Sequence, residues 1–297
     1  MTTSLTKNGA LARLLTEYRG RDCAILLNNG NRGDGVSHEG GRQFMSAIGI
    51  TPREFHEADF SRMRGDVLLI HGAGSLARRP RALKQLVKYV VPRFTTIVLL
   101  PTSFDVEDST VKTFAASWDQ KYQVFCRELV TFSGLQSMRV SPRTILLGQD
   151  LALHVDLTEW SARPATGRAG LFRRDDEAAF GRLPRDFDVV ADASAGSERE
   201  PHRLLDFVAR FQEIHTDRSH AAIVAAMMGR RVVFYRNRYF KNRAIYDHSL
   251  AGLPNVRFAR GNAFSLAQFS RVVYWNQVLP LQNKIQRLFQ GPEAAAA

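Results

Sequence analysis

The feature that most constrains the fold is a regular alternation of short apolar runs with amphipathic segments. Apolar runs predict strands at 23–28, 66–70, 96–100, 122–126 and 144–147, and again at 171–173, 188–191, 213–215, 232–235 and 256–258. Between them, apolar residues at helical spacing predict helices, for example at 35–48, 110–118 and 219–228. Strands that alternate with helices form parallel sheets, so the sequence predicts an α/β fold.

The segment 157–169 interrupts this alternation and contains Pro, Gly, Ser and Thr, which predicts a linker. We therefore expect two Rossmann-like lobes that face a cleft, over residues 1–160 and 161–297, with closing helices from Ala263 onward. In sheets of this kind, ligands bind beyond the carboxyl ends of the strands. The residues that directly follow each strand are thus the candidates for function.

The composition favours an anionic partner and a cytoplasmic location. Lys and Arg number 41 against 29 Asp and Glu, a net charge of +12, which suits phosphates and carboxylates as well as nucleic acid or an anionic membrane. No apolar run is long enough to span a bilayer, and residues 1–21 lack the apolar core of a secretory signal. Cys23 and Cys126 lie in predicted strands, which favours buried free thiols. The chain has no CxxC, HExxH or GxSxG motif, so we expect no metal and no serine acyl transfer.

Two glycine-rich loops follow strands of the first lobe. In the loop at 28–35, Asp34 either caps the next helix, which helix-start statistics favour, or binds a sugar hydroxyl. The loop at 71–75 either lets a substrate approach the backbone or forms a turn that needs positive φ, and His71 reads as a structural histidine. Arg127 ends a strand and either points toward the cleft or pairs with Glu128 on the surface.

Cations also follow the strands of the second lobe. Arg218 and His220 precede an Ala-rich helix and predict an anion pocket, with an Asp or Ser cap flanked by Arg as the alternative. Arg173 ends the first strand of this lobe. The basic loop 236–243 brings Lys241 and Asn242 within reach of an anion, unless it is simply solvated. Basic and aromatic residues interleave over 230–243, as in surfaces that bind nucleic acid.

These features form an ordered set of short motifs, at 31–34, 71–75, 101–103, 126–128, 147–150, 172–175, 216–220 and 237–242. No single motif is specific, but the set resembles the polysaccharide pyruvyl transferase family over roughly residues 21–260. The segment T-D-R-S-H at 216–220, before a small-residue helix, is its most characteristic member. Ser219 stands where the family usually has Leu, and the usual G-G-G loop is G-A-G at 72–74.

The resemblance implies lobes arranged as in GT-B glycosyltransferases. It also implies an enzyme that forms a pyruvate ketal on a sugar of a bacterial exopolysaccharide or cell-surface polysaccharide precursor, with phosphoenolpyruvate as donor and no cofactor. Because the donor carries a phosphate and a carboxylate, it needs several cations. The implied catalytic residues are His220 and Arg218. The implied donor-binding residues are Arg127, Arg173, Arg218, His220, Lys241 and Asn242. The implied acceptor-binding residues are Asn31, Asp34, His71, Gly72, Gly74 and Ser75.

Further expectations concern partners. An acceptor carried on a lipid would bring the protein peripherally to the inner membrane face. A GT-B glycosyltransferase would have the same lobes and phosphate pocket, and would bind a nucleotide diphosphate instead of phosphoenolpyruvate. A non-catalytic binder of nucleic acid or anionic surfaces would show a steep salt dependence. Because the cations are spread over both lobes and follow strands, we expect no nucleic-acid partner.

Overall fold

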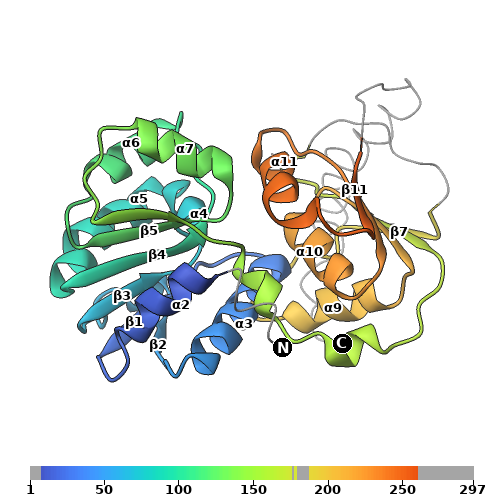
Figure 1. Ribbon diagram of the computed structural model, residues 1–297, viewed down its shortest axis with the longest axis horizontal. Coiled ribbons are helices and arrows are strands. Elements are labelled where there is room, and N and C mark those ends of the chain that lie inside the picture. The colour runs from blue at the N-terminus through green and yellow to red at the C-terminus, as the bar shows by residue number, and fades with distance from the viewer. Residues whose placement is uncertain (1–7, 176, 179–186, 260–297) are drawn as a thin grey trace, which may run out of the picture.

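Two parallel sheets organise the protein (Figure 1). The computed structural model describes residues 8–175, 177–178 and 187–259 of the 297-residue chain. The first sheet has the order β2-β1-β3-β4-β5-β6, and the second has the order β11-β10-β9-β7-β8. Every strand pairing among these residues is parallel. The predicted α/β class and the two Rossmann-like lobes are therefore confirmed, whereas the predicted closing helices lie outside the described residues.

The first sheet is built from β1 (Cys23–Leu26), β2 (Arg53–Phe55), β3 (Val67–Ile70), β4 (Thr96–Thr102), β5 (Tyr122–Cys126) and β6 (Thr144–Leu147). Its helices are α2 (Gly9–Thr16), α3 (Arg32–Ala47), α4 (Ala73–Ala77), α5 (Pro80–Gln85), α6 (Ser109–Ala116) and α7 (Leu129–Ser137). Helix α5 continues as a π-helix, η2 (Leu86–Val90), and shorter turns are η1 (Glu57–Asp59), η3 (Val91–Arg93) and η4 (Leu151–His154).

The second sheet is built from β7 (Arg168–Leu171), β8 (Val189–Ala191), β9 (Glu213–Thr216), β10 (Arg231–Phe234) and β11 (Val256–Phe258). Its helices are α9 (Pro201–Ala209), α10 (Ser219–Met227) and α11 (Lys241–Ile245), which continues as the π-helix η5 (Tyr246–Leu250). The short helix α8 (Thr158–Ser161) lies between the sheets, in the segment predicted as a linker.

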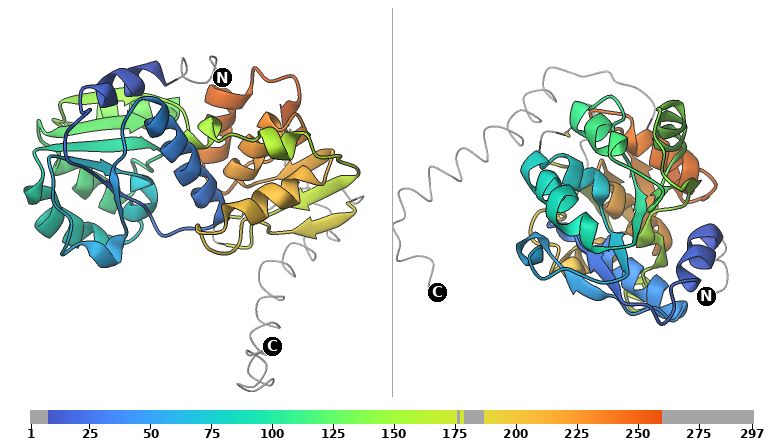
Figure 2. Two further views of the ribbon diagram at one scale, coloured as in Figure 1. Left: turned by 90° about the horizontal axis from the view of Figure 1, so that it is seen from below. Right: turned by 90° about the vertical axis from the view of Figure 1, so that its left-hand side faces the viewer.

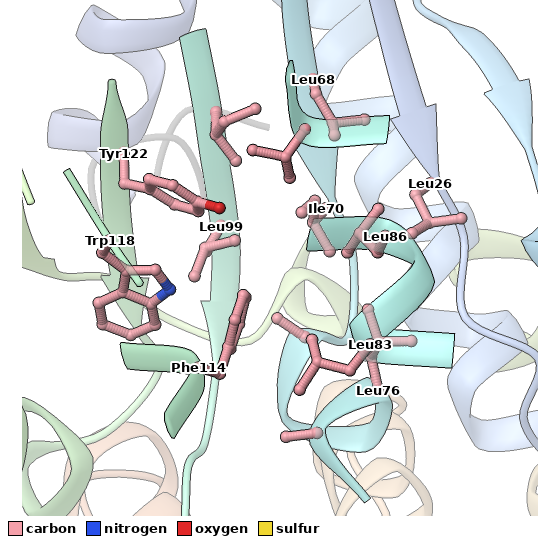
Figure 3. Close-up of a cluster of buried hydrophobic side chains, with 14 of the residues drawn as sticks. Leu26, Leu68, Ile70, Leu76, Leu83, Leu86, Leu99, Phe114, Trp118 and Tyr122 are labelled. Carbon is pink, nitrogen blue, oxygen red and sulfur yellow. The ribbon is translucent and has the colours of Figure 1, made fainter. Parts of the chain in front are cut away.

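Alternation along the strands of the first sheet creates two apolar layers. In β3, Leu68 and Ile70 join a cluster with α4, α5 and α6 (Figure 3), whereas Val67 and Leu69 join a cluster with α2 and α3 on the opposite face. Successive side chains of a strand point to opposite faces, so a strand covered on both sides reads as one continuous apolar run. This is why the buried strands were visible in the sequence.

Helix α3 belongs to the first lobe by sequence but packs into the second (Figures 1 and 2). It contacts η4, α9 and α10, and Val36 is fully buried in the apolar cluster of the second sheet. Gly35 approaches the second lobe so closely that a Cβ atom there would lie 2.0 Å from the carbonyl oxygen of Glu198. Helix α3 therefore contributes to the apolar cores of both lobes, with Phe44 and Met45 in the first and Val36 in the second.

Three local predictions need correction. Helix α3 begins at Arg32 and not at residue 35, because Asn31 caps it and Asp34 completes a capping box by accepting from the Asn31 backbone N–H at 2.9 Å. Asp34 as a capping residue is thereby confirmed. Strand β4 runs past Pro101, because the pairing with β5 is irregular there and proline is tolerated at a bulge. The loop at 71–75 is shorter than predicted, because α4 begins at Ala73; the alternative of a turn that needs positive φ is confirmed at Gly72, whose φ is 65°.

Sequence reasoning also missed α2, β2 and α7, which complete the first lobe. Both cysteines are buried and free, as predicted. Among the described residues, every helix is too short or too polar to cross a lipid bilayer.

Candidate functional site

A cavity of about 440 Å³ lies between the two lobes. This volume is in the range of small-molecule sites. Its walls come from the carboxyl ends of strands in both sheets and from the helices that follow them. The predicted site residues that line the cavity come from both lobes. They are Asn31, Asp34, His71, Gly72, Gly74, Ser75, Arg127, Arg173, Arg218, His220 and Lys241.

Asn242 is the predicted donor-binding residue that does not line the cavity. Its side chain is fully buried, and its amide donates to the carbonyl oxygens of Asp217 at 2.6 Å and Tyr235 at 3.0 Å. The prediction of anion binding by Asn242 is therefore corrected. Asn242 instead fixes the turn that follows β10, which positions Lys241.

Arg127 reaches the cavity from the end of β5. Its Nη1 lies 2.6 Å from Oδ2 of Asp150, and its Nε donates to Oγ of Ser103 at 3.0 Å. A surface pair with Glu128 is excluded, since Glu128 is fully buried and caps α7 by accepting from the Thr131 N–H at 3.0 Å.

Asp150 is buried and ionised beneath this wall. Burial alone would raise the pKa of its carboxyl, but His220 and Arg127 lower that pKa to well below its ordinary value. The His220 ring enters from the first turn of α10, with Nε2 3.5 Å from Oδ2 of Asp150. One carboxylate of the first lobe thus faces an arginine of its own lobe and a histidine of the other.

Arg218 occupies the N-cap position of α10 and is held by two carboxylates. Its Nε and Nη2 contact the two oxygens of Asp192 at 3.1 and 2.5 Å, and its Nη1 contacts Asp175 at 2.8 Å. The alternative of an Asp or Ser cap is wrong, because Arg218 itself is the N-cap residue of α10 and its side chain makes no capping hydrogen bond.

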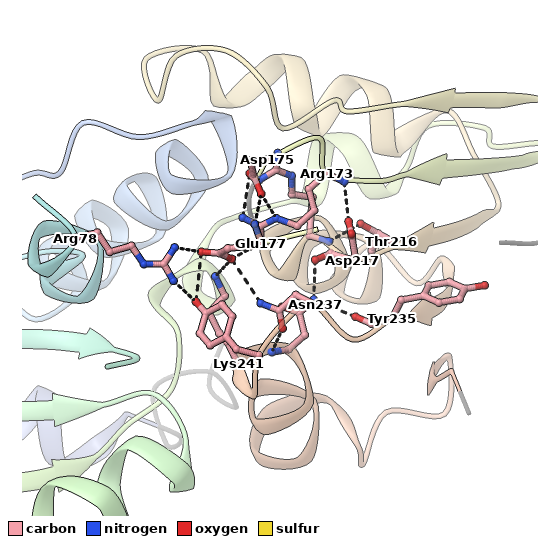
Figure 4. Close-up of polar contacts among 12 residues, drawn as sticks. Arg78, Arg173, Asp175, Glu177, Thr216, Asp217, Tyr235, Asn237 and Lys241 are labelled. Atoms are coloured by element: carbon pink, nitrogen blue, oxygen red, sulfur yellow. Dashed lines mark hydrogen bonds and ion pairs between the residues drawn. The ribbon is translucent and has the colours of Figure 1, made fainter. Parts of the chain in front are cut away.

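Glu177 is the centre of a cluster of cations on the second-lobe side (Figure 4). One of its oxygens, Oε2, lies 2.6 Å from Nη1 of Arg173 and 2.7 Å from Nζ of Lys241. The other, Oε1, pairs with Arg78 and accepts from the Tyr239 hydroxyl at 3.3 Å. We call Arg78, Arg173, Tyr239 and Lys241 the Glu177 cage.

Neutral polar groups also line the cavity, His71 and Asn28 from the first lobe and Ser194 from the second. His71 Nδ1, Asn28 Nδ2 and Ser194 Oγ are buried without a hydrogen-bond partner, and all three residues line the cavity. Burial lowers the pKa of His71 to about 4, although Asp150 and Asp34 oppose this effect. His71 is therefore neutral at pH 7 and offers a hydrogen bond to a ligand, not a charge.

Several site residues escaped sequence reasoning. Arg78 follows α4, Glu177 lies just beyond the segment at 172–175, and Asp150 ends the segment at 147–150. Tyr239 lies within the turn at 237–242, where the sequence predicts anion binding only for Lys241 and Asn242. Among the described residues, no three His, Cys, Asp or Glu side chains are grouped to hold a metal ion.

Comparison with known proteins supports the fold alone. No family model matches the sequence, and no curated protein matches it. A solved structure of a functional uncharacterized protein from Klebsiella pneumoniae subsp. pneumoniae NTUH-K2044 is similar, with a TM-score of 0.67 and 22% sequence identity over 88% of this chain and 100% of that chain. At this identity the shared fold carries no function with it.

Proposed function

We propose that this protein is a polysaccharide pyruvyl transferase that uses phosphoenolpyruvate to form a pyruvate ketal on a sugar. The observation that carries the proposal is that five side-chain cations and unpartnered neutral polar groups line one cavity between the lobes. The cations are Arg78, Arg127, Arg173, Arg218 and Lys241. A donor with two anionic groups needs the first set, and a sugar needs the second. A GT-B-like arrangement of the lobes is part of this proposal.

His220 is the proposed proton carrier. Its ring lines the cavity, and its Nε2 lies 3.5 Å from Oδ2 of Asp150. In the first step, His220 delivers a proton to the methylene carbon of phosphoenolpyruvate while the first sugar hydroxyl oxygen bonds to C2, and that hydroxyl returns its proton to His220. In the second step, the bond from C2 to the phosphate oxygen breaks and the second hydroxyl oxygen bonds to C2. Its proton leaves with inorganic phosphate.

The acceptor is proposed to lie against the first lobe. His71 and Asn28 present unpartnered nitrogens there, and Ser75 lines the same wall. Asp34 retains its capping role while it faces the cavity, so its backbone bond limits how far its carboxylate turns toward a sugar. Gly72 admits a ligand close to the backbone because it has no side chain.

Calorimetric titration of phosphoenolpyruvate into the wild-type protein tests the donor, with Arg218→Ala and His220→Ala beside it. We expect binding by the wild type and loss of at least about tenfold in affinity for Arg218→Ala. Arg231→Ala and His202→Ala are the matched controls, because neither residue lines the cavity. Arg218→Lys keeps a charge beside Asp192 and serves if Arg218→Ala is unstable.

A parallel titration with a nucleotide sugar tests the alternative function, glycosyl transfer. If it binds and phosphoenolpyruvate does not, glycosyl transfer replaces pyruvyl transfer. A cytoplasmic enzyme with a lipid-linked acceptor would also bind vesicles that contain anionic phospholipid, and co-sedimentation without binding would count against that acceptor.

A further inference from the structure

Every cation on the cavity wall already has a carboxylate partner within the protein. Arg78 and Lys241 pair with Glu177, Arg127 pairs with Asp150, Arg173 pairs with Asp175 and Glu177, and Arg218 pairs with Asp175 and Asp192. An anionic ligand therefore enters a site whose cations are engaged. A ligand that binds these cations therefore competes with the carboxylates for the same N–H donors.

Of the four carboxylates, only that of Glu177 lies where a ligand in the cavity can displace it. Glu177 lines the cavity, whereas Asp150, Asp175 and Asp192 do not. The side chains of Asp150 and Asp192 are only 2% and 5% exposed, so they lie beneath the arginines and hold them in place. Glu177 lines the open volume itself, beside Arg78, Arg173 and Lys241.

The electrostatic field of the cage favours an anion with more charge than one carboxylate. Three cations, Arg78, Arg173 and Lys241, face the single charge of Glu177. Burial alone would raise the pKa of Glu177, but Lys241 and Arg173 hold it well below its ordinary value. Glu177 is therefore ionised at neutral pH and behaves as a bound anion.

We propose that the Glu177 cage is a binding site for one phosphate or carboxylate group of the ligand, and that Glu177 occupies this site as an internal competitor until the ligand displaces it. The proposal rests on the proposed function only in taking this cavity as an anion site. The backbone of Glu177 is anchored, because its carbonyl oxygen accepts from the Arg238 N–H at 3.0 Å. Rotation about its side-chain bonds is sufficient to withdraw the carboxylate.

Replacement of the charge tests the proposal with inorganic phosphate as probe. Glu177→Gln keeps the shape of the side chain and removes its charge. We expect it to bind inorganic phosphate at least about tenfold more tightly than the wild type by calorimetry. The titration is run at about pH 6.5, since Glu177 is one of the groups that keep Lys241 protonated.

Glu213→Gln is the matched control. Glu213 has the same exposed fraction as Glu177, 13%, and also pairs with two arginines, Arg168 and Arg231, but it does not line the cavity. It should leave phosphate affinity unchanged. The double variant Glu177→Gln with Lys241→Ala should lose the gain, which places the tighter binding in the cage.

Equal or weaker phosphate binding by Glu177→Gln would overturn the proposal and make Glu177 a fixed part of the cage. If that variant does not fold, Glu177→Asp decides, because its shorter carboxylate reaches the cage poorly and should still bind phosphate more tightly than the wild type. Unchanged affinity in Glu177→Asp would then overturn it. Phosphate binding does not depend on pyruvyl transfer. If phosphoenolpyruvate does not bind but Glu177→Gln still binds inorganic phosphate more tightly than the wild type, the proposed function is rejected and the role of Glu177 as an internal competitor stands.

Discussion

Nε2 of His220 lies 3.5 Å from Oδ2 of Asp150, and this contact joins a helix of the second lobe to the start of η4, after the last strand of the first. The same Asp150 oxygen accepts from Arg127 at 2.6 Å. The catalytic geometry of the proposed reaction therefore depends on a group that is almost inaccessible to the ligand. Asp150 is a positioning residue for His220.

Asp150→Asn should destabilise the protein by about 3 kcal/mol or more at pH 7, because it leaves Arg127 as a buried charge without its partner. The folded-state pKa of Asp150 lies below its ordinary value, so its contribution is present above the ordinary carboxyl range and is lost as pH falls through the folded pKa. Urea unfolding of both proteins from pH 7 down to pH 3 measures this. A constant difference between them across that range would contradict the assignment.

Asp217 should make the protein less stable as the pH rises. Burial raises its pKa to about 7 from 3.8, against the opposing effect of the Arg173 N–H that it accepts. The folded state thus binds a proton that the unfolded state releases, and stability falls between about pH 4 and pH 7 by roughly 2–4 kcal/mol. Asp217→Asn retains the acceptor oxygen and should flatten this slope in denaturant unfolding. An unaltered slope in the variant would disprove the role of Asp217.

Anion binding should weaken as pH rises through about 8. Burial lowers the pKa of Lys241 to about 8; Glu177 opposes this effect, whereas Arg173 and Arg127 add to it. Sulfate, whose charge is constant over the range, should bind the wild type more weakly at pH 9 than at pH 7. Lys241→Arg should keep its affinity, because guanidinium remains charged. Parallel titration of both proteins makes the comparison, and an identical pH profile would exclude Lys241.

Gly35→Ala should destabilise the protein although alanine favours helices. A Cβ atom at residue 35 would meet the Glu198 carbonyl oxygen at 2.0 Å, so α3 and the second lobe must separate, at a cost of about 1–3 kcal/mol. Gly252→Ala is the control, because no heavy atom lies within 4 Å of its added Cβ. Thermal unfolding measures the melting temperature of each variant. Equal melting temperatures for Gly35→Ala and Gly252→Ala would show that the contact between Gly35 and Glu198 is not tight.

Sequence reasoning located four of the five cavity cations, all but Arg78, but not their partners. Arg127 and Arg218 follow strands, and the parallel topology brings the ends of such strands to one edge, so their approach to a common cavity was predictable. Their neutralisation by Asp150 and Asp192 was not, because those partners come from other strands and only tertiary packing brings them within 4 Å. The same limit hid Glu177, which belongs to no periodic segment.

The boundaries of the strands were also predictable where they depend on the local sequence and not where they depend on tertiary pairing. Strands β5, β6 and β11 begin and end where their apolar runs do. In β5 every residue is buried, so burial on both faces leaves a continuous apolar signal. Strand β4 exceeds its prediction because pairing with β5 resumes at Thr102, beyond the proline. The role of Asn242 was misjudged because a buried amide and an exposed one look alike in sequence.

The position of Val36 has a consequence for biosynthesis. This residue is made early, on α3, but its apolar neighbours in the second lobe, such as Leu204 and Ile214, are made much later. As the chain leaves the ribosome, the first lobe must expose that face of α3 until the second lobe arrives to cover it. The helix that packs into both lobes of the finished protein is, during translation, the surface on which a chaperone would act.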